Sequence, residues 1–178
     1  MKFIKISLAF IIFMVYNGTV FSHETEKALV DIKFSIDTRM GLTKGQFRKS
    51  ELKIKDRKKM LGLVEIDVSS IDTDSVKRDN HLRNEDFFDV TKYSKAVFEI
   101  IEVQPSGKDS FLGKGNLTIK NIKKTYSFPI KLERENKSEK FTGKIKINRK
   151  DFGIDYSSSI NPIQDIADVE FIITIPAK

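Results

Sequence analysis

Apolar and polar residues alternate with a period of two along most of the chain. In the first such stretch, Val30, Ile32 and Phe34 alternate with Asp31 and Lys33. Because successive side chains of a strand point to opposite faces of a sheet, this pattern predicts antiparallel strands with one face in a core and the other in water. The stretches that show it are residues 30–36, 64–68, 111–119, 122–132, 141–147 and 169–175.

Clusters of turn-forming residues separate these stretches. About eight strands with short connections favour an up-and-down barrel or a sandwich. No internal repeat, low-complexity tract or linker divides the chain, so one domain is expected. The predicted turns are at residues 41–43, 105–107, 121, 136–138 and 161–162.

One segment, residues 70–79, interrupts the alternation. Thr73 or Asp74 is expected to cap a short helix that runs to about Arg83. Phe87 and Phe88 follow it and return apolar side chains to the core. The prediction is therefore an all-β domain of about eight strands with one short helical excursion.

The first 22 residues have the layout of a secretory signal peptide. Lys2 and Lys5 precede an apolar run over residues 6–16, and Val20 and Ser22 are small residues at the expected cleavage positions. The alternative is a membrane anchor, but a spanning helix needs about 20 apolar residues and this run is shorter. We therefore expect cleavage after Ser22, a mature domain of residues 23–178, and a periplasmic or secreted location.

Composition removes several classes of function. The 178 residues include no cysteine, which excludes disulfides, thiolate nucleophiles and cysteine zinc sites, and only two histidines, which exclude a His-rich metal site. We expect neither a metal, nor a cofactor, nor catalytic residues. The formal charge of +7 rests on 32 Lys and Arg against 25 Asp and Glu. A basic surface could attract an anionic membrane transiently, or could serve solubility alone. No outward aromatic and basic stripe points to nucleic acid.

A family resemblance begins in the helical excursion. The sequence resembles the YceI-like family in an ordered series of motifs, and the series covers essentially all of residues 23–178. Two departures are Ser94, where the family usually has proline, and Asn121, where it usually has glycine; asparagine tolerates the left-handed conformation nearly as well. The motifs are Ser70-Ile71-Asp72-Thr73, Arg78 to Arg83, Asp86 to Val90, Lys92-Tyr93, Ala96-Val97-Phe98, Gly115 to Ile119 and Arg149 to Ile154.

The resemblance implies a lipocalin-like antiparallel β-barrel, exported in bacteria, that binds a polyisoprenoid or related amphiphilic lipid in its interior for transport, storage or sequestration. An alternative is a secreted structural or surface-interaction protein of the same fold without a lipid. An enzyme would need polar residues converging inside the barrel, which the alternation does not place there. Whether the protein forms a homodimer stays open.

The candidate lipid-binding residues are apolar positions on the inward faces. Each of them alone is better explained as ordinary core, so the prediction concerns the set. Glycines on the same faces, such as Gly113, Gly115 and Gly143, either leave room inside or mark bulges and bends. The predicted lining is Phe34, Phe47, Phe98, Ile100, Gly115, Leu117, Ile119, Tyr126, Phe128 and Phe171.

The polar residues of the excursion could suggest an acid–base site. No nucleophile accompanies them, so we expect them to cap the helix and to form salt bridges that hold it across one end of the barrel. Arg149 and Asp151 are expected to hold the penultimate strand. A contact between Arg78 or His81 and a lipid head group stays open. The residues concerned are Arg78, Asp79, His81, Arg83, Asp86 and Asp89.

Overall fold

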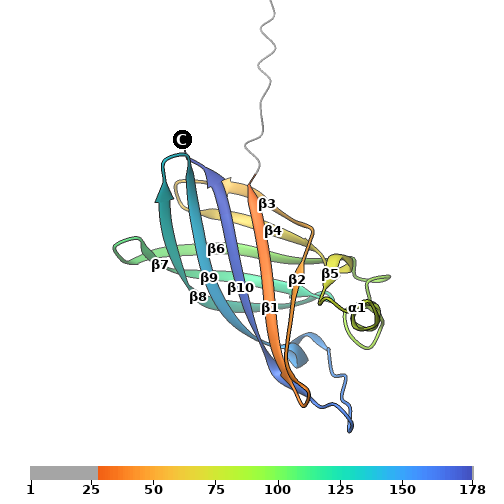
Figure 1. The fold of residues 1–178 in the computed structure, drawn as a ribbon. Helices are drawn as coiled ribbons and strands as arrows, with labels where there is room; N and C mark the ends of the chain where they lie inside the picture. Colours follow the sequence, from red (N-terminus) through yellow and green to blue (C-terminus); the bar gives the residue numbers. More distant parts are fainter. Residues whose placement is uncertain (1–27, 178) are drawn as a thin grey trace, which may run out of the picture.

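Ten strands and one short helix make up the fold, and the computed structural model describes residues 28–177 (Figure 1). The predicted signal peptide, residues 1–22, lies outside the described residues. The helix α1 spans Val76–Arg83, and two 3₁₀ turns, η1 and η2, span Val68–Ser70 and Arg149–Phe152. The strands are β1 (Leu29–Thr38), β2 (Gly41–Phe47), β3 (Ser50–Asp56), β4 (Leu61–Asp67), β5 (Ile71–Asp72), β6 (Lys95–Gly107), β7 (Ser110–Ile119), β8 (Ile122–Glu135), β9 (Ser138–Asn148) and β10 (Ile163–Pro176).

The strands form a single antiparallel sheet in the order β3-β4-β6-β7-β8-β9-β10-β1-β2-β5. The sheet curls round on itself, which brings β3 beside β1, as Figure 1 shows. Among the described residues no hydrogen-bonded ladder joins β3 to β1, so the barrel has a seam between these strands. The all-β, barrel-like prediction is confirmed.

The number of strands was underestimated, because β2 and β3 lack a clear apolar period. Residues 41–43 are not a turn: the two-residue turn is Arg39-Met40, and Gly41, with φ of 109°, begins β2. Residues 105–107 lie at the end of β6, and the turn that follows is Lys108-Asp109. The turns predicted at 121, 136–138 and 161–162 are confirmed, although Ser138 itself begins β9.

The middle of the barrel is filled by phenylalanine rings. The ring centroids of Phe98 and Phe128 are 5.2 Å apart, and those of Phe128 and Phe171 are 5.7 Å apart. All three side chains are buried, and Phe128 is 1% exposed. Burial of large aromatic side chains contributes strongly to stability, so this cluster is the centre of the core.

Glycines on the inward faces lie beneath these rings. A Cβ atom at Gly115 would be 2.6 Å from Cζ of Phe98 and 2.9 Å from the Glu99 carbonyl oxygen. Gly113 faces Phe128 and Gly143 faces Phe171 in the same way, each across a register pair. The space that these glycines leave is therefore occupied by neighbouring phenyl rings rather than by an open cavity.

Helix α1 lies across one end of the barrel (Figure 1). It ends at Arg83 as predicted, but its N-cap is Ser75, not Thr73 or Asp74: the Ser75 hydroxyl accepts a hydrogen bond from the Arg78 amide at 3.4 Å. Asp74 instead has a positive φ of 58°, in the left-handed region. Within residues 28–177, no helix is long and apolar enough to cross a membrane.

Candidate functional site

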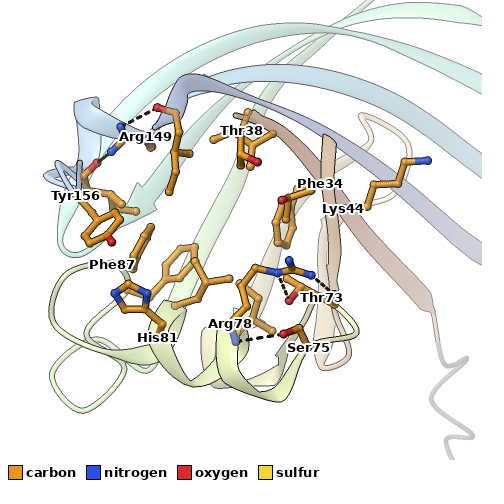
Figure 2. A pocket seen from close by; sticks show the side chains of 18 of the residues that line it. Phe34, Thr38, Lys44, Thr73, Ser75, Arg78, His81, Phe87, Arg149 and Tyr156 are labelled. Atoms are coloured by element: carbon orange, nitrogen blue, oxygen red, sulfur yellow. Dashed lines mark hydrogen bonds between the residues drawn. The ribbon is translucent and has the colours of Figure 1, made fainter. Parts of the chain in front are cut away.

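A cavity of about 1140 Å³ opens at the end of the barrel that carries α1, and we call it the mouth cavity (Figure 2). Around the opening its walls come from β1, β2, β10, α1, η2 and the segment 155–162, and further lining residues come from β4, β5, β6, β7 and β9. It reaches the surface, because the lining residue Met40 is 87% exposed. Its deeper wall is apolar and includes Ile36, Ile66, Ala167 and Val169.

Polar side chains gather at the opening of the mouth cavity rather than in its depth. The cations among the lining residues are Lys44, Lys77, Arg78 and Arg149, whereas the acid among them is Asp74. The Lys44 side chain extends away from the cavity, while Arg78 lies at its edge (Figure 2). Arg149 is buried and pairs with Asp165, so the positive excess at the opening comes from Lys44, Lys77 and Arg78 against Asp74, and the interior is apolar.

Hydrogen bonds between Thr73 and α1 hold the helix over the opening. The buried Asp79 carboxylate accepts from the Thr73 amide at 2.9 Å and from the Thr73 hydroxyl at 2.6 Å. Arg78 donates to the Thr73 hydroxyl at 2.8 Å and to its carbonyl at 2.5 Å. Arg83 donates to the carbonyls of Ser69 and Ile71, at 2.7 and 2.8 Å. These polar residues attach the helix to the segment before it.

Three rings form a second contact across the opening. His81 of α1 lies edge-on to Phe87 and to Tyr156, with centroid distances of 5.0 and 4.9 Å. Phe87 and Tyr156 are themselves 4.8 Å apart. His81 Nε2 also lies 3.5 Å from an Asp86 carboxylate oxygen. The cluster joins α1 to the segment 155–162, as Figure 2 shows.

Arg149 of η2 anchors the same segment from the opposite wall. Its guanidinium donates to the Ile154 carbonyl at 2.6 Å, and to the carbonyls of Gln164 and Ile163 at 3.2 and 3.3 Å. It also pairs with Asp165 at 3.0 Å. A hydrogen bond from Lys150 is the main cause that lowers the pKa of the Asp165 carboxyl. The Arg149 guanidinium therefore donates to groups of the protein itself, and these bonds support the wall of the mouth cavity.

Two smaller cavities continue the interior toward the other end of the barrel. A middle cavity of about 50 Å³ shares Leu117 and Val169 with the mouth cavity. A far cavity of about 330 Å³ shares Ile100 and Phe171 with the middle cavity. The three cavities are therefore neighbours that share apolar side chains, and the phenylalanine cluster fills the space between them.

The family profile of the YceI-like domain matches residues 23–175, which is most of the chain. The chain belongs to the YceI-like family. A UPF0312 protein of Serratia proteamaculans is 34% identical over 120 residues, a match that covers 63% of this chain and 59% of that protein. A UPF0312 protein of Pseudomonas aeruginosa is 37% identical over 97 residues, covering 51% of this chain and 50% of that protein. The chain thus spans little more than half the length of these curated relatives.

Solved structures share the YceI-like fold. BcnA of Burkholderia cenocepacia superposes with a TM-score of 0.75 at 22% identity, covering 82% of this chain and 95% of that one. A polyisoprenoid binding domain from Saccharophagus degradans superposes with a TM-score of 0.68 at 14% identity, covering 84% of this chain and 94% of that one. At these identities the likeness concerns the fold.

The YceI-like fold distributes the ten predicted lining residues over different parts of the interior. Gly115 lies beneath Phe98, and Phe128 is sealed within the core. Tyr126 packs against the core, where its hydroxyl is buried without a hydrogen-bond partner among the described residues. Phe34, Phe47, Leu117 and Ile119 line the mouth cavity, whereas Phe98, Ile100 and Phe171 line the middle or far cavity.

Several lining residues of the mouth cavity were absent from the prediction. Ile36, Ile147 and Val169 continue the same inward alternation and could have been included on that signal. Tyr156 and Asn161 lie in an irregular segment, where no period indicates which side chains face inward. Their place follows from the anchoring of that segment by Arg149.

The polar motif residues make structural contacts, but Ser75 rather than one of them caps α1, and hydrogen bonds to Thr73 and to backbone carbonyls, rather than the predicted salt bridges, attach the helix. A hydrogen bond from Lys92 lowers the pKa of Asp89, which holds the turn after α1. Arg149 holds the last strand, β10, through carbonyls rather than the penultimate strand as predicted, and Asp151 is exposed. Among residues 28–177, no three His, Asp or Glu side chains come together as metal ligands would. Arg78 and His81 both line the mouth cavity, and a contact between either of them and a lipid head group stays a prediction.

Proposed function

We propose that this protein binds a lipid with a long apolar chain, a polyisoprenoid or similar amphiphile, with the chain in the mouth cavity and the polar end at its opening. The observation that carries the proposal is the apolar cavity of about 1140 Å³ beneath an electropositive rim. Pockets for small ligands usually measure about 300–1,000 Å³, so this one suits a larger molecule. The polyisoprenoid binding domain with the same fold supports the same class of ligand.

The energetics favour an apolar ligand over a polar solute. A long isoprenoid has on the order of 40 carbons, and large ligands gain about 0.3 kcal/mol per heavy atom, which gives roughly 12 kcal/mol of binding free energy. No specific polar contact is needed for that affinity. A small polar solute would leave most of the apolar wall exposed to water, which is unfavourable.

The proposal includes an exported protein that transports, stores or sequesters its lipid and does not catalyse a reaction on it. The N-terminal sequence pattern of residues 1–22 supports export. Binding rather than catalysis is supported by the way the polar residues near the opening are used. Asp79 and Arg149 direct their polar atoms at neighbouring backbone and hydroxyl groups, so they hold structure in place.

Native mass spectrometry of gently purified protein tests the proposal. The protein should carry an apolar adduct, and Ala167→Phe, which fills the mouth cavity from β10, should reduce the adduct at least about tenfold. The matched control is Ile166→Phe, which places the same ring one residue away on the outer face, where Ile166 is 44% exposed. The control should retain the adduct.

Two results would contradict the proposal. An adduct that persists unchanged in a normally folded Ala167→Phe protein would place the lipid elsewhere. A wild-type protein that stays empty, even after incubation with a polyisoprenoid, would favour the alternative of a surface-interaction protein with this fold. Circular dichroism of both variants verifies that the sheet is intact.

A further inference from the structure

We propose that the rim of the mouth cavity is a docking surface for an anionic lipid bilayer, where the protein loads and unloads its ligand; this inference rests on the proposed function. The rim comprises exposed side chains from three separate elements: the β1–β2 hairpin, the start of α1 and the segment 155–162. Its members are Arg39, Met40, Leu42, Lys44, Val76, Lys77 and Ile160.

Large apolar side chains project from each of these elements. Met40 is 87% exposed, Ile160 is 84% exposed and Val76 is 76% exposed. Single exposed apolar residues are ordinary on a protein surface, but these belong to the parts of the fold that surround one opening. At the opposite end, the β6–β7 turn Lys108-Asp109 and the β8–β9 turn Asn136-Lys137 carry polar side chains, and the β3–β4 turn carries Lys58 and Lys59 beside the half-buried Met60.

The hairpin and the segment 155–162 form one continuous edge. The Arg39 amide donates a hydrogen bond to the Pro162 carbonyl at 3.1 Å, which joins the two tips. Met40 itself lines the mouth cavity, as do Ser75 and Lys77 on either side of Val76. Each projecting apolar residue is therefore next to the opening through which a lipid would pass.

Basic side chains accompany the apolar ones. Arg39, Lys44 and Lys77 are exposed, and no carboxylate of the described residues lies within salt-bridge distance of their charged groups. The exposed acids on the same three elements are Asp37, Asp74 and Asp155, whereas Asp79 is buried. With the exposed Arg78 of α1 the cations number four against these three acids, so the rim keeps a small positive balance. Basic residues near an anionic membrane surface each contribute binding energy, and apolar side chains between them insert at the head-group boundary.

The combination of apolar and basic side chains favours a lipid bilayer over other binding partners. Apolar tips alone would suit many partners, and lysines alone would suit any anion. Their arrangement round the opening of an apolar cavity places the cavity directly against the membrane, so that an isoprenoid chain can move between the two without crossing water. Crossing water would expose the whole chain, at a cost that scales with its apolar area.

Flotation with lipid vesicles tests the docking. The protein is used in the N-terminal form that the cells produce, established by mass spectrometry and identical in every variant. Vesicles of phosphatidylcholine with phosphatidylglycerol should bind it, and binding should fall as salt rises. Lys44→Glu with Lys77→Glu should weaken binding at least about 25-fold, since each basic residue near the surface contributes about fivefold. Met40→Asp with Ile160→Asp should weaken it comparably.

The matched control is Lys108→Glu with Lys137→Glu, which makes the same change in net charge at the opposite end and should bind almost as the wild type does. Equal losses from both charge-reversal pairs would show that net charge alone attracts the protein, and would overturn a localised docking surface. Wild-type binding that the rim variants leave unchanged, or no binding at all, would overturn it too.

Native mass spectrometry on the same samples separates the two proposals. Rim variants that carry the apolar adduct but do not float would support docking through the rim and leave the proposed function intact. Rim variants that do not float, together with a wild-type protein that floats but carries no adduct, would support the docking and contradict the proposed function. An adduct in a wild-type protein that never floats would contradict the docking alone.

Discussion

The ring of Phe98 on β6 lies over Gly115 on β7, so closely that a Cβ atom at Gly115 would be 2.6 Å from Cζ of the ring. The Glu99 carbonyl oxygen, 2.9 Å away, closes the other side. The ring cannot retreat, because Phe128 packs against it. Gly115 is therefore part of the packing of the core rather than an open space in the cavity wall.

Gly115→Ala should destabilise the protein by about 1–3 kcal/mol, since an added methyl group overpacks a filled core. The control is Gly107→Ala at the end of β6, where an added Cβ meets only the Ser110 Cβ at 3.7 Å. Urea unfolding should show a lower midpoint for the first variant and an unchanged or higher one for the second. Equal midpoints for the two would refute the close packing.

Asp79→Ala should loosen α1 from the mouth cavity. It removes the acceptor of two hydrogen bonds and leaves the buried Thr73 amide without its partner, at a cost of roughly 2 kcal/mol. Hydrogen exchange should accelerate along Val76–Arg83. Asp86→Ala, which affects an exposed carboxylate 3.5 Å from His81, is the control and should cost at most about 1 kcal/mol. Unchanged exchange in α1 would show that other contacts hold the helix.

Glu65 should make stability depend on pH. Its carboxylate on β4 accepts hydrogen bonds from Lys95 on β6 and Lys53 on β3, both at 2.9 Å, and these bonds lower its pKa below the ordinary 4.5. Because the folded pKa is the lower one, the contribution is complete above the unfolded pKa. It is lost as pH falls through the folded pKa.

The free energy of unfolding of Glu65→Gln should accordingly lie below that of the wild type at neutral pH, by at most about 1 kcal/mol, because both lysine partners are exposed to solvent. The two should converge in acid. Urea titrations at a series of pH values measure the difference. A double variant, Lys53→Gln with Lys95→Gln, should show the same convergence, and a difference that stays constant with pH would count against the ion pairs.

Tyr126→Phe should leave the protein equally stable or stabilise it by about 1 kcal/mol. The hydroxyl is buried without a partner among the described residues, and burial raises the pKa of the phenol. Removing an unsatisfied buried polar group removes its desolvation cost. The wild type should also lose stability in strong alkali, where the unfolded phenol ionises before the folded one, and the variant should lack this loss. A lower melting temperature for the variant would reveal an unrecognised partner.

Sequence periodicity located the parts of the fold in which one face is consistently buried. Val169 and Phe171 illustrate this, since alternation placed both inside and the structure does too. β2 escaped notice because Gly41, Lys44 and Gly45 disturb its apolar period. A strand that forms only because its neighbours pair with it shows no hydrophobic alternation in its own sequence.

The sequence predicted which faces of the strands point inward but not which inward side chains border a cavity. Inward phenylalanines could be identified, but whether a ring lines a cavity or fills the core depends on the residue opposite it. Phe34 borders the mouth cavity, whereas Phe128 is sealed against Phe98 and Phe171. Tyr156 lies at the site because Arg149 donates hydrogen bonds to the backbone carbonyls of Ile154 and Gln164, on either side of it in the sequence. These are tertiary contacts, and no hydrophobic pattern in the sequence around Tyr156 indicates them.

The seam between β1 and β3 bears on what sets the width of the barrel. A sheet closed by hydrogen bonds on every side has a fixed circumference, set by strand number and stagger. Among the described residues no ladder of hydrogen bonds completes the circumference between β1 and β3. Ladder bonds therefore do not fix the width of the barrel on this side, and a change in the separation of β1 and β3 would break none of them.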